Sequence, residues 1–118
     1  MIALAESKLK DLSMAFAVDI LNFCESIKGH YSLVNQLERA ATSIGAKIRE
    51  ANYAHSKPDF IAKLQIALKE CYETESWLEL LQKAGLASEE TAKNRIHACG
   101  SIRKLLIASI NTARKNRT

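Results

Sequence analysis

The chain has 118 residues, of which 47% are hydrophobic and 25% are charged. This is the length of one domain and the composition of a protein that buries a core, which excludes a disordered or collagen-like chain. Four Gly and one Pro are too few for the turns of a β-sandwich or small barrel, so a few long helices are expected.

The first predicted helix spans residues 6–28. Apolar residues recur at steps of three and four from Leu9 to Ile27, which makes one helix face apolar, and Gly29 follows. A second apolar set lies on the far side of this helix, where a helix of an isolated bundle should be polar. Its members are Met14, Val18 and Leu21.

The second predicted helix spans residues 32–54, with Ser32 as its expected N-cap. Small residues between positions 40 and 46 would let a neighbouring helix approach closely, which accounts for Gly45 in a helix interior. Beside the apolar face runs a polar stripe, which we interpret as a solvated face or a hydrogen-bonded seam between subunits. The stripe contains Gln36, Arg39, Ser43, Lys47 and Glu50.

The third predicted helix spans residues 57–84 and has the best marked start. Ser56 can cap it, and Pro58 falls in the first turn, where its missing N–H is not needed. Gly85 marks its end. This helix also carries a second apolar face, consisting of Ile66, Trp77 and Leu80. Together with the second face of the first helix, it leads to the hypothesis of a homo-oligomer.

The fourth predicted helix spans residues 88–115 and begins at Ser88. Arg103 falls within its apolar face, where a charge needs a partner, and Glu75 on the inward side of the third helix is the candidate for a buried ion pair. Arg103 could instead lie at a bundle end and extend its charge to water. Four long helices with short connections predict an all-α fold, a single antiparallel up-down-up-down four-helix bundle over residues 1–118.

Positive charge is concentrated at the end of the sequence. Residues 91–118 contain seven basic and no acidic residues, whereas the first 90 residues contain 10 basic and 13 acidic ones. Such segregation is typical of a surface that meets phosphate or an acidic partner, although cations are also favoured in the last turn of any helix. The candidate nucleic-acid-binding residues are Lys93, Arg95, Lys104, Arg114, Lys115 and Arg117.

Lys93, Lys104 and Lys115 are spaced by eleven residues, or three helical turns, and so share one flank of the fourth helix. No aromatic residue is interleaved with this row. The pattern therefore favours sequence-tolerant electrostatic contact with RNA or DNA over a stacking platform for single strands.

The sequence does not point to catalysis. Its three His are far apart and lack metal-ligand spacing, and neither a phosphate loop nor a nucleophile with its base is recognisable, so no catalytic residue, metal site or cofactor is expected. Its three Cys are odd in number, lack the close spacings of metal ligands or redox pairs, and fall at apolar positions of the helices, which predicts buried, reduced thiols. With no secretory signal and no apolar run long enough to cross a bilayer, a cytoplasmic protein without membrane contact is expected.

A set of residues between positions 36 and 86 forms a recognisable pattern. It consists of Gln36-Leu37, Arg39-Ala40, Ser43-Ile44, Ile48, Glu50, Ser56, Asp59-Phe60, Ala67 to Glu70 and Glu73 to Leu81. On these residues, the stretch 36–86 resembles the bacterial four-helix bundle family known as the 23S rRNA intervening-sequence proteins. With the outer helices in register, the resemblance covers nearly the whole chain. Lys47 departs from it, because many relatives have Asn at this position.

The chain also looks like the accessory protein of diversity-generating retroelements, a basic bundle that forms a ring of five and contacts nucleic acid and a reverse transcriptase. The resemblance thus implies a homopentamer with RNA or DNA, a reverse transcriptase or another protein as partner. Two hypotheses follow from the sequence as a whole. The first is a non-catalytic adaptor that associates with nucleic acid through its basic fourth helix, and the second is a protein-protein scaffold with no direct nucleic-acid contact.

Overall fold

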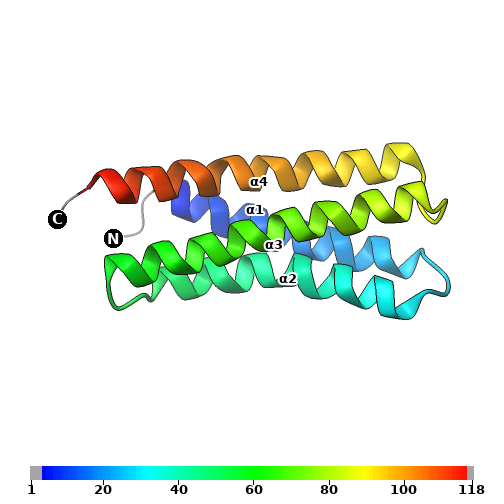
Figure 1. Ribbon diagram of the computed structural model, residues 1–118, viewed down its shortest axis with the longest axis horizontal. Coiled ribbons are helices and arrows are strands. Elements are labelled where there is room, and N and C mark those ends of the chain that lie inside the picture. Colours follow the sequence, from blue (N-terminus) through cyan, green and yellow to red (C-terminus); the bar gives the residue numbers. More distant parts are fainter. Residues whose placement is uncertain (1–3, 117–118) are drawn as a thin grey trace.

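The computed structural model describes residues 4–116 of the chain, and the side chains of residues 7–116. It contains four helices, α1 (Leu4–Glu25), α2 (Tyr31–Asn52), α3 (Lys57–Lys83) and α4 (Glu89–Lys115), and no strand in the described range. Consecutive helices run in opposite directions, so the start of α1, the end of α4 and the α2–α3 connection share one end of an elongated bundle (Figure 1). The all-α bundle predicted from the apolar spacing is therefore present.

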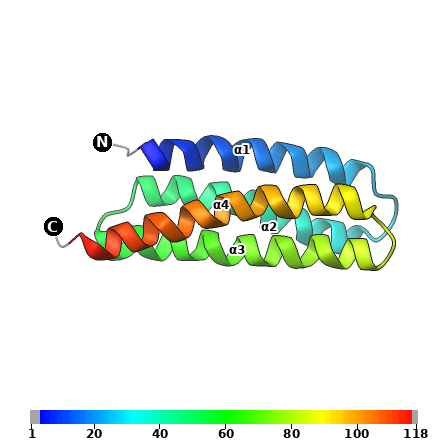
Figure 2. The same cartoon turned by 90° about the horizontal axis from the view of Figure 1, so that it is seen from above.

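One core runs along the axis of the bundle. Each helix contacts two others, in the cyclic order α1, α2, α3 and α4, and the view from above shows the same arrangement (Figure 2). Burying one face of each helix removes its apolar side chains from water, which is the main stabilising contribution to such a fold. The largest fully buried hydrophobic side chains are Leu9, Ile20, Leu37, Ile44, Ile48, Leu64, Leu78, Leu81, Ile102 and Leu106.

The ends of α3 follow the sequence signals. The Ser56 hydroxyl accepts a hydrogen bond from the Asp59 N–H at 3.2 Å, which satisfies a donor that the first turn leaves free. At the other end Gly85 has φ of 78°. Its N–H donates to the Gln82 carbonyl while the Leu86 N–H donates to the Leu81 carbonyl, the paired bonds of a Schellman motif.

The α1–α2 connection differs from the expectation. α1 ends at Glu25, and the apolar spacing overestimated its length because Ile27 stays buried after the helical hydrogen bonds have ended. The prediction of Ser32 as N-cap is wrong. The cap of α2 is His30, in the left-handed conformation with φ of 53° and without a side-chain cap bond, so that α2 starts at Tyr31.

α1 and α2 approach closely at Gly45, as the run of small residues predicted. A Cβ added at Gly45 would lie 3.2 Å from the Ser13 Oγ of α1, and Ser13 itself is buried. The Ser13 hydroxyl donates to the Lys10 carbonyl at 3.1 Å, so its burial leaves no donor unpaired. Gly45 therefore has a packing role that offsets its poor helix propensity.

Candidate nucleic-acid interface

The fold separates charge along the axis of the bundle. Residues 4–14, 42–70 and 103–116 form the half that contains the start of α1 and the end of α4, and this half, here called the basic end, holds eleven basic and five acidic residues. The other half, residues 15–41 and 71–102, holds five basic and eight acidic residues and is called the acidic end. Positive potential is thus concentrated at one end of the molecule and not spread along the whole of α4.

The predicted lysine row of α4 is divided by this boundary. Lys93 lies in the acidic end and forms an ion pair with Glu89 one turn earlier. Lys104 and Lys115 lie in the basic end and are exposed, and no acidic side chain in the described part of the chain comes within 4 Å of either. Only these two lysines of the row combine exposure with a basic neighbourhood.

Arg95 is held within the bundle. Its Nη2 donates to the Asp19 Oδ1 of α1 at 3.1 Å, and its Nη1 donates to the Thr91 carbonyl at 3.1 Å. Its Nε lies 3.1 Å from the second Asp19 oxygen without being aligned for a hydrogen bond. The guanidinium also stacks over the Phe23 ring, with 4.5 Å between Cζ and the ring centroid. Arg95 thus joins α4 to α1, and it does not project to the surface as predicted for a phosphate ligand.

The remaining predicted contacts lie at the C-terminus of α4. Arg114 and Lys115 occupy its last turn and are exposed. Cations at this position also interact favourably with the helix dipole. Arg117 lies outside the described residues.

The predicted pair of Arg103 and Glu75 is present between α4 and α3. The Arg103 Nε donates to the Glu75 Oε2 at 2.9 Å. Their side chains are 26% and 18% exposed, so the pair is partly buried and not fully removed from water. A Cβ at Gly100 would lie 3.2 Å from the Arg103 Nη2, so the glycine leaves room for the guanidinium. Arg103 also lies over the ring of Tyr72, with 5.4 Å between the Arg103 Cζ and the ring centroid.

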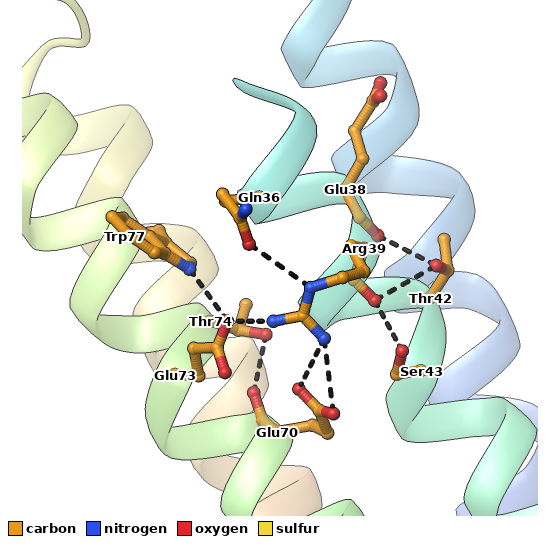
Figure 3. A network of polar contacts seen from close by, with 9 residues as sticks. All are labelled: Gln36, Glu38, Arg39, Thr42, Ser43, Glu70, Glu73, Thr74 and Trp77. Carbon is orange, nitrogen blue, oxygen red and sulfur yellow. Dashed lines mark hydrogen bonds and ion pairs between the residues drawn. The ribbon is translucent and has the colours of Figure 1, made fainter. Parts of the chain in front are cut away.

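Within the polar stripe of α2, Arg39 forms a bridge to α3 (Figure 3). Its guanidinium contacts a Glu73 oxygen through Nη2 and both Glu70 oxygens at 3.4 Å through Nη1. The Arg39 Nε donates to the Gln36 Oε1 at 3.2 Å, and the Trp77 Nε1 donates to the Glu73 Oε2 at 3.1 Å. This network lies between helices of one subunit, whereas the sequence left open a seam between subunits.

The rest of the stripe makes local contacts. The Ser43 hydroxyl donates to the Arg39 carbonyl at 2.6 Å, and Lys47 pairs with Glu50 at 3.2 Å along the same helix. The pKa of Glu73 is lowered, first by the hydrogen bond from Trp77 and then by Arg39. The Arg39 network is therefore charged and hydrogen-bonded at neutral pH.

The second apolar faces are mostly exposed, as the sequence predicted. On α1, Met14 and Val18 are 55% and 51% exposed, and Leu21 is also exposed. On α3, Ile66 and Leu80 are exposed, but Trp77 is partly buried against the core of its own subunit. The indole is held there by its hydrogen bond to Glu73, so it contributes less free surface than its size suggested.

Two residues of α3 that the sequence did not predict as nucleic-acid contacts lie where the basic end meets the acidic end. Lys69 and Tyr72 lie one turn apart on α3, and both are exposed. Arg103 brings Tyr72 against α4, so an aromatic ring does adjoin the basic residues of α4. The expectation that no aromatic accompanies them considered α4 alone. Aligning the third and fourth helices as antiparallel neighbours could have predicted that Tyr72 lies close to Arg103.

Other kinds of site are not formed by the described residues. In residues 4–116 no group of three or more His, Cys, Asp or Glu is placed to hold a metal ion. None of the described helices is long and apolar enough to cross a membrane. The three cysteines are free and buried, as predicted.

These features define an elongated all-helical bundle with a basic end and partly exposed apolar faces. The model of the family described as 23S rRNA-intervening sequence protein matches residues 5–108, and the chain belongs to this family. The chain is similar to the crystal structure of a protein of unknown function from the S23 ribosomal protein family of Bacteroides thetaiotaomicron. The two are 41% identical, with 92% of this chain and 99% of that chain covered and a TM-score of 0.87. No curated protein matches the chain.

Proposed function

We propose that this protein is a non-catalytic, homo-oligomeric adaptor that associates with RNA or DNA through the basic end of its bundle. The observation that carries the proposal is the group of exposed cations there. Lys69, Lys104, Arg114 and Lys115 are exposed, and none has an acidic partner within 4 Å among the described residues. Cations that are not neutralised by the protein are available to replace the counterions of a phosphate backbone.

The family description refers to an intervening sequence of 23S rRNA, which leaves both RNA and DNA open as the nucleic acid. The contacts are proposed to go to phosphate and not to base edges, because a lysine is a point charge on a flexible stem and carries little geometric information. Lys93 and Arg95 are left out of the proposed interface, since each is paired with an acidic residue in the acidic end. The free thiols support a reducing compartment such as the cytoplasm.

Charge reversal tests the interface. Lys104→Glu combined with Lys115→Glu should weaken binding of a labelled RNA about tenfold or more and should reduce its salt dependence. The matched control is Lys93→Glu, on the same flank of the same helix but in the acidic end, and it should change the affinity less than about twofold. Binding by fluorescence anisotropy at several salt concentrations gives both quantities. Equal losses in the two variants, or binding that does not respond to salt, would contradict the proposal.

The exposed apolar residues support self-association. Met14, Val18 and Leu21 are exposed at steps of four and three on one side of α1, and large exposed apolar patches occur at protein–protein interaction sites. Sedimentation velocity should give a mass several times the 13.1 kDa of one chain. Val18→Lys should shift the protein towards the monomer, because a charge cannot be buried without a partner. A wild-type protein that is monomeric at micromolar concentration would exclude this part of the proposal.

The exposed cations of the basic end are also compatible with a second candidate function, a protein-protein scaffold in which this end binds an acidic protein. The charge-reversal experiment separates the two, because only the adaptor loses RNA affinity when Lys104 and Lys115 are reversed.

A further inference from the structure

Tyr72 and Arg103 form a cation–π contact between α3 and α4. The Arg103 Cζ lies over the Tyr72 ring, 5.4 Å from its centroid, and the Arg103 Nε also donates to the Glu75 Oε2 at 2.9 Å. Tyr72 nevertheless remains 52% exposed. Tyr72 therefore contacts Arg103 while about half of the surface of the residue is free to contact another planar group.

The surroundings of the ring are basic on one side. Lys69 precedes Tyr72 by three residues on α3, and Lys104 follows Arg103 on α4. Both are exposed, with no described carboxylate within 4 Å. From Lys104 the surface of α4 continues to Arg114 and Lys115, over about 16 Å at 1.5 Å per residue.

On α3 the acidic end starts at residue 71, and Glu75 and Glu79 follow Tyr72 there. Tyr72 thus lies at the boundary between the two ends, just inside the acidic end and three residues from Lys69 of the basic end. The carboxylates of the acidic end would repel a bound polyanion, and the cations of the basic end would attract it. We therefore expect the polyanion to extend from Tyr72 over the basic end.

We infer that Tyr72, supported by Arg103, is a stacking site for an unpaired base, with the phosphates of the same strand on Lys69, Lys104 and the C-terminal turns of α4. This inference rests on the proposed function and specifies its substrate class as single-stranded nucleic acid. A base inside a duplex has both of its faces covered by neighbouring base pairs. An unpaired base has a free face that can stack on the Tyr72 ring. An aromatic ring next to a row of cations is the combination that sequence-tolerant single-strand binders use.

The test compares a short labelled single-stranded RNA with a duplex of the same sequence. Tyr72→Ala should weaken single-strand binding between about fivefold and a hundredfold and leave duplex binding nearly unchanged. Tyr72→Phe should retain single-strand binding because it keeps the ring. Tyr31→Ala removes a tyrosine that is 73% exposed at the acidic end, and as the matched control it should have no effect.

The outcomes separate this inference from the proposed function. If reversing Lys104 and Lys115 lowers the affinity while Tyr72→Ala does not, the stacking site is excluded and the electrostatic interface stands. Equal losses of single-strand and duplex affinity in Tyr72→Ala would also exclude it. Tyr72→Leu keeps an apolar side chain of similar bulk without a planar ring and should bind as weakly as Tyr72→Ala. Full affinity in Tyr72→Leu would show that bulk and not stacking matters, which overturns the inference.

Discussion

Arg39 shows at the scale of one residue why a stripe of polar side chains need not be a binding row. The planar guanidinium presents several donors in a fixed geometry, which lets it contact Glu70, Glu73 and Gln36 at once. The Glu70 side chain is 15% exposed, whereas the Arg39 side chain is 47% exposed. Arg39 therefore neutralises acidic groups that are less accessible to water than itself.

Removing this guanidinium should destabilise the bundle. Arg39→Ala leaves Glu70 and Glu73 close together without a countercharge, and we expect a loss of about 1 kcal/mol in the free energy of unfolding, a value kept small because water screens the half-exposed arginine. Urea unfolding followed by circular dichroism measures it. Arg49→Ala, at an exposed position of the same helix, is the control and should be nearly neutral. Equal stability of the two variants would show that the bridge is not stabilising.

The same network predicts a pH dependence. The pKa of Glu73 is lowered in the folded protein by the Trp77 hydrogen bond and by Arg39, so its stabilising contribution is present above the pKa of a free glutamate, about 4.3. The contribution is lost as the pH falls through the lowered pKa of the folded state. The difference in urea midpoint between wild type and Glu73→Gln should therefore shrink between pH 7 and about pH 3. A difference that does not change with pH would contradict the assigned interactions.

The cysteines provide a second residue-scale prediction. Burial raises the pKa of Cys24 to about 11, and the pKa of Cys99 is raised by its hydrogen bond with Cys71 and by burial. Because the thiolate is the reactive form, the thiols should react with an aromatic disulfide reagent at pH 8 only as fast as the protein opens. Unfolding in urea should make them react at once. Rapid reaction of the folded protein would mean that a thiol is accessible.

At the scale of the helices, the apolar spacing predicts which residues face the core, but not where the hydrogen bonds of each helix end. α3 and α4 begin where Ser56 and Ser88 predict, because a side-chain cap is a local signal. The start of α2 could not be found in this way, since His30 caps it through its left-handed backbone and not through its side chain. The end of α1 could not be found from the apolar spacing either, because Ile27 is buried in the turn that follows the helix.

The packing of α1 on α2 depends on Gly45 and is open to a direct test. Gly45→Leu would place the new side chain against Ser13. It should lower the free energy of unfolding by about 1 to 3 kcal/mol, because a well-packed contact cannot accept added volume. Ala46→Leu, at the next and exposed position, should change stability by less than about 0.5 kcal/mol. Thermal unfolding of both variants measures the effect. If Gly45→Leu is as stable as Ala46→Leu, the close approach of α1 and α2 has no energetic importance.

At the scale of the whole molecule, the candidate site was only partly predictable. The sequence shows that residues 91–118 are basic, but Lys93 is paired with Glu89 and Arg95 with Asp19. Asp19 lies 76 positions before Arg95, so the sequence alone does not reveal this pair. Conversely, Lys69 and Tyr72 join the surface only because α3 lies antiparallel to α4. Such neighbours depend on the register between helices, which the periodicity of one helix does not contain.

Lysine reactivity tests the central claim, that the basic end is the nucleic-acid interface, most directly. An amine-acylating reagent with and without single-stranded RNA, read out by mass spectrometry, reports each lysine separately. The account predicts protection of Lys69, Lys104 and Lys115 by RNA, with Lys28, Lys83 and Lys93 at the acidic end unchanged. Protection of the acidic-end lysines instead, or no protection of any lysine at an RNA concentration that saturates binding, would contradict it.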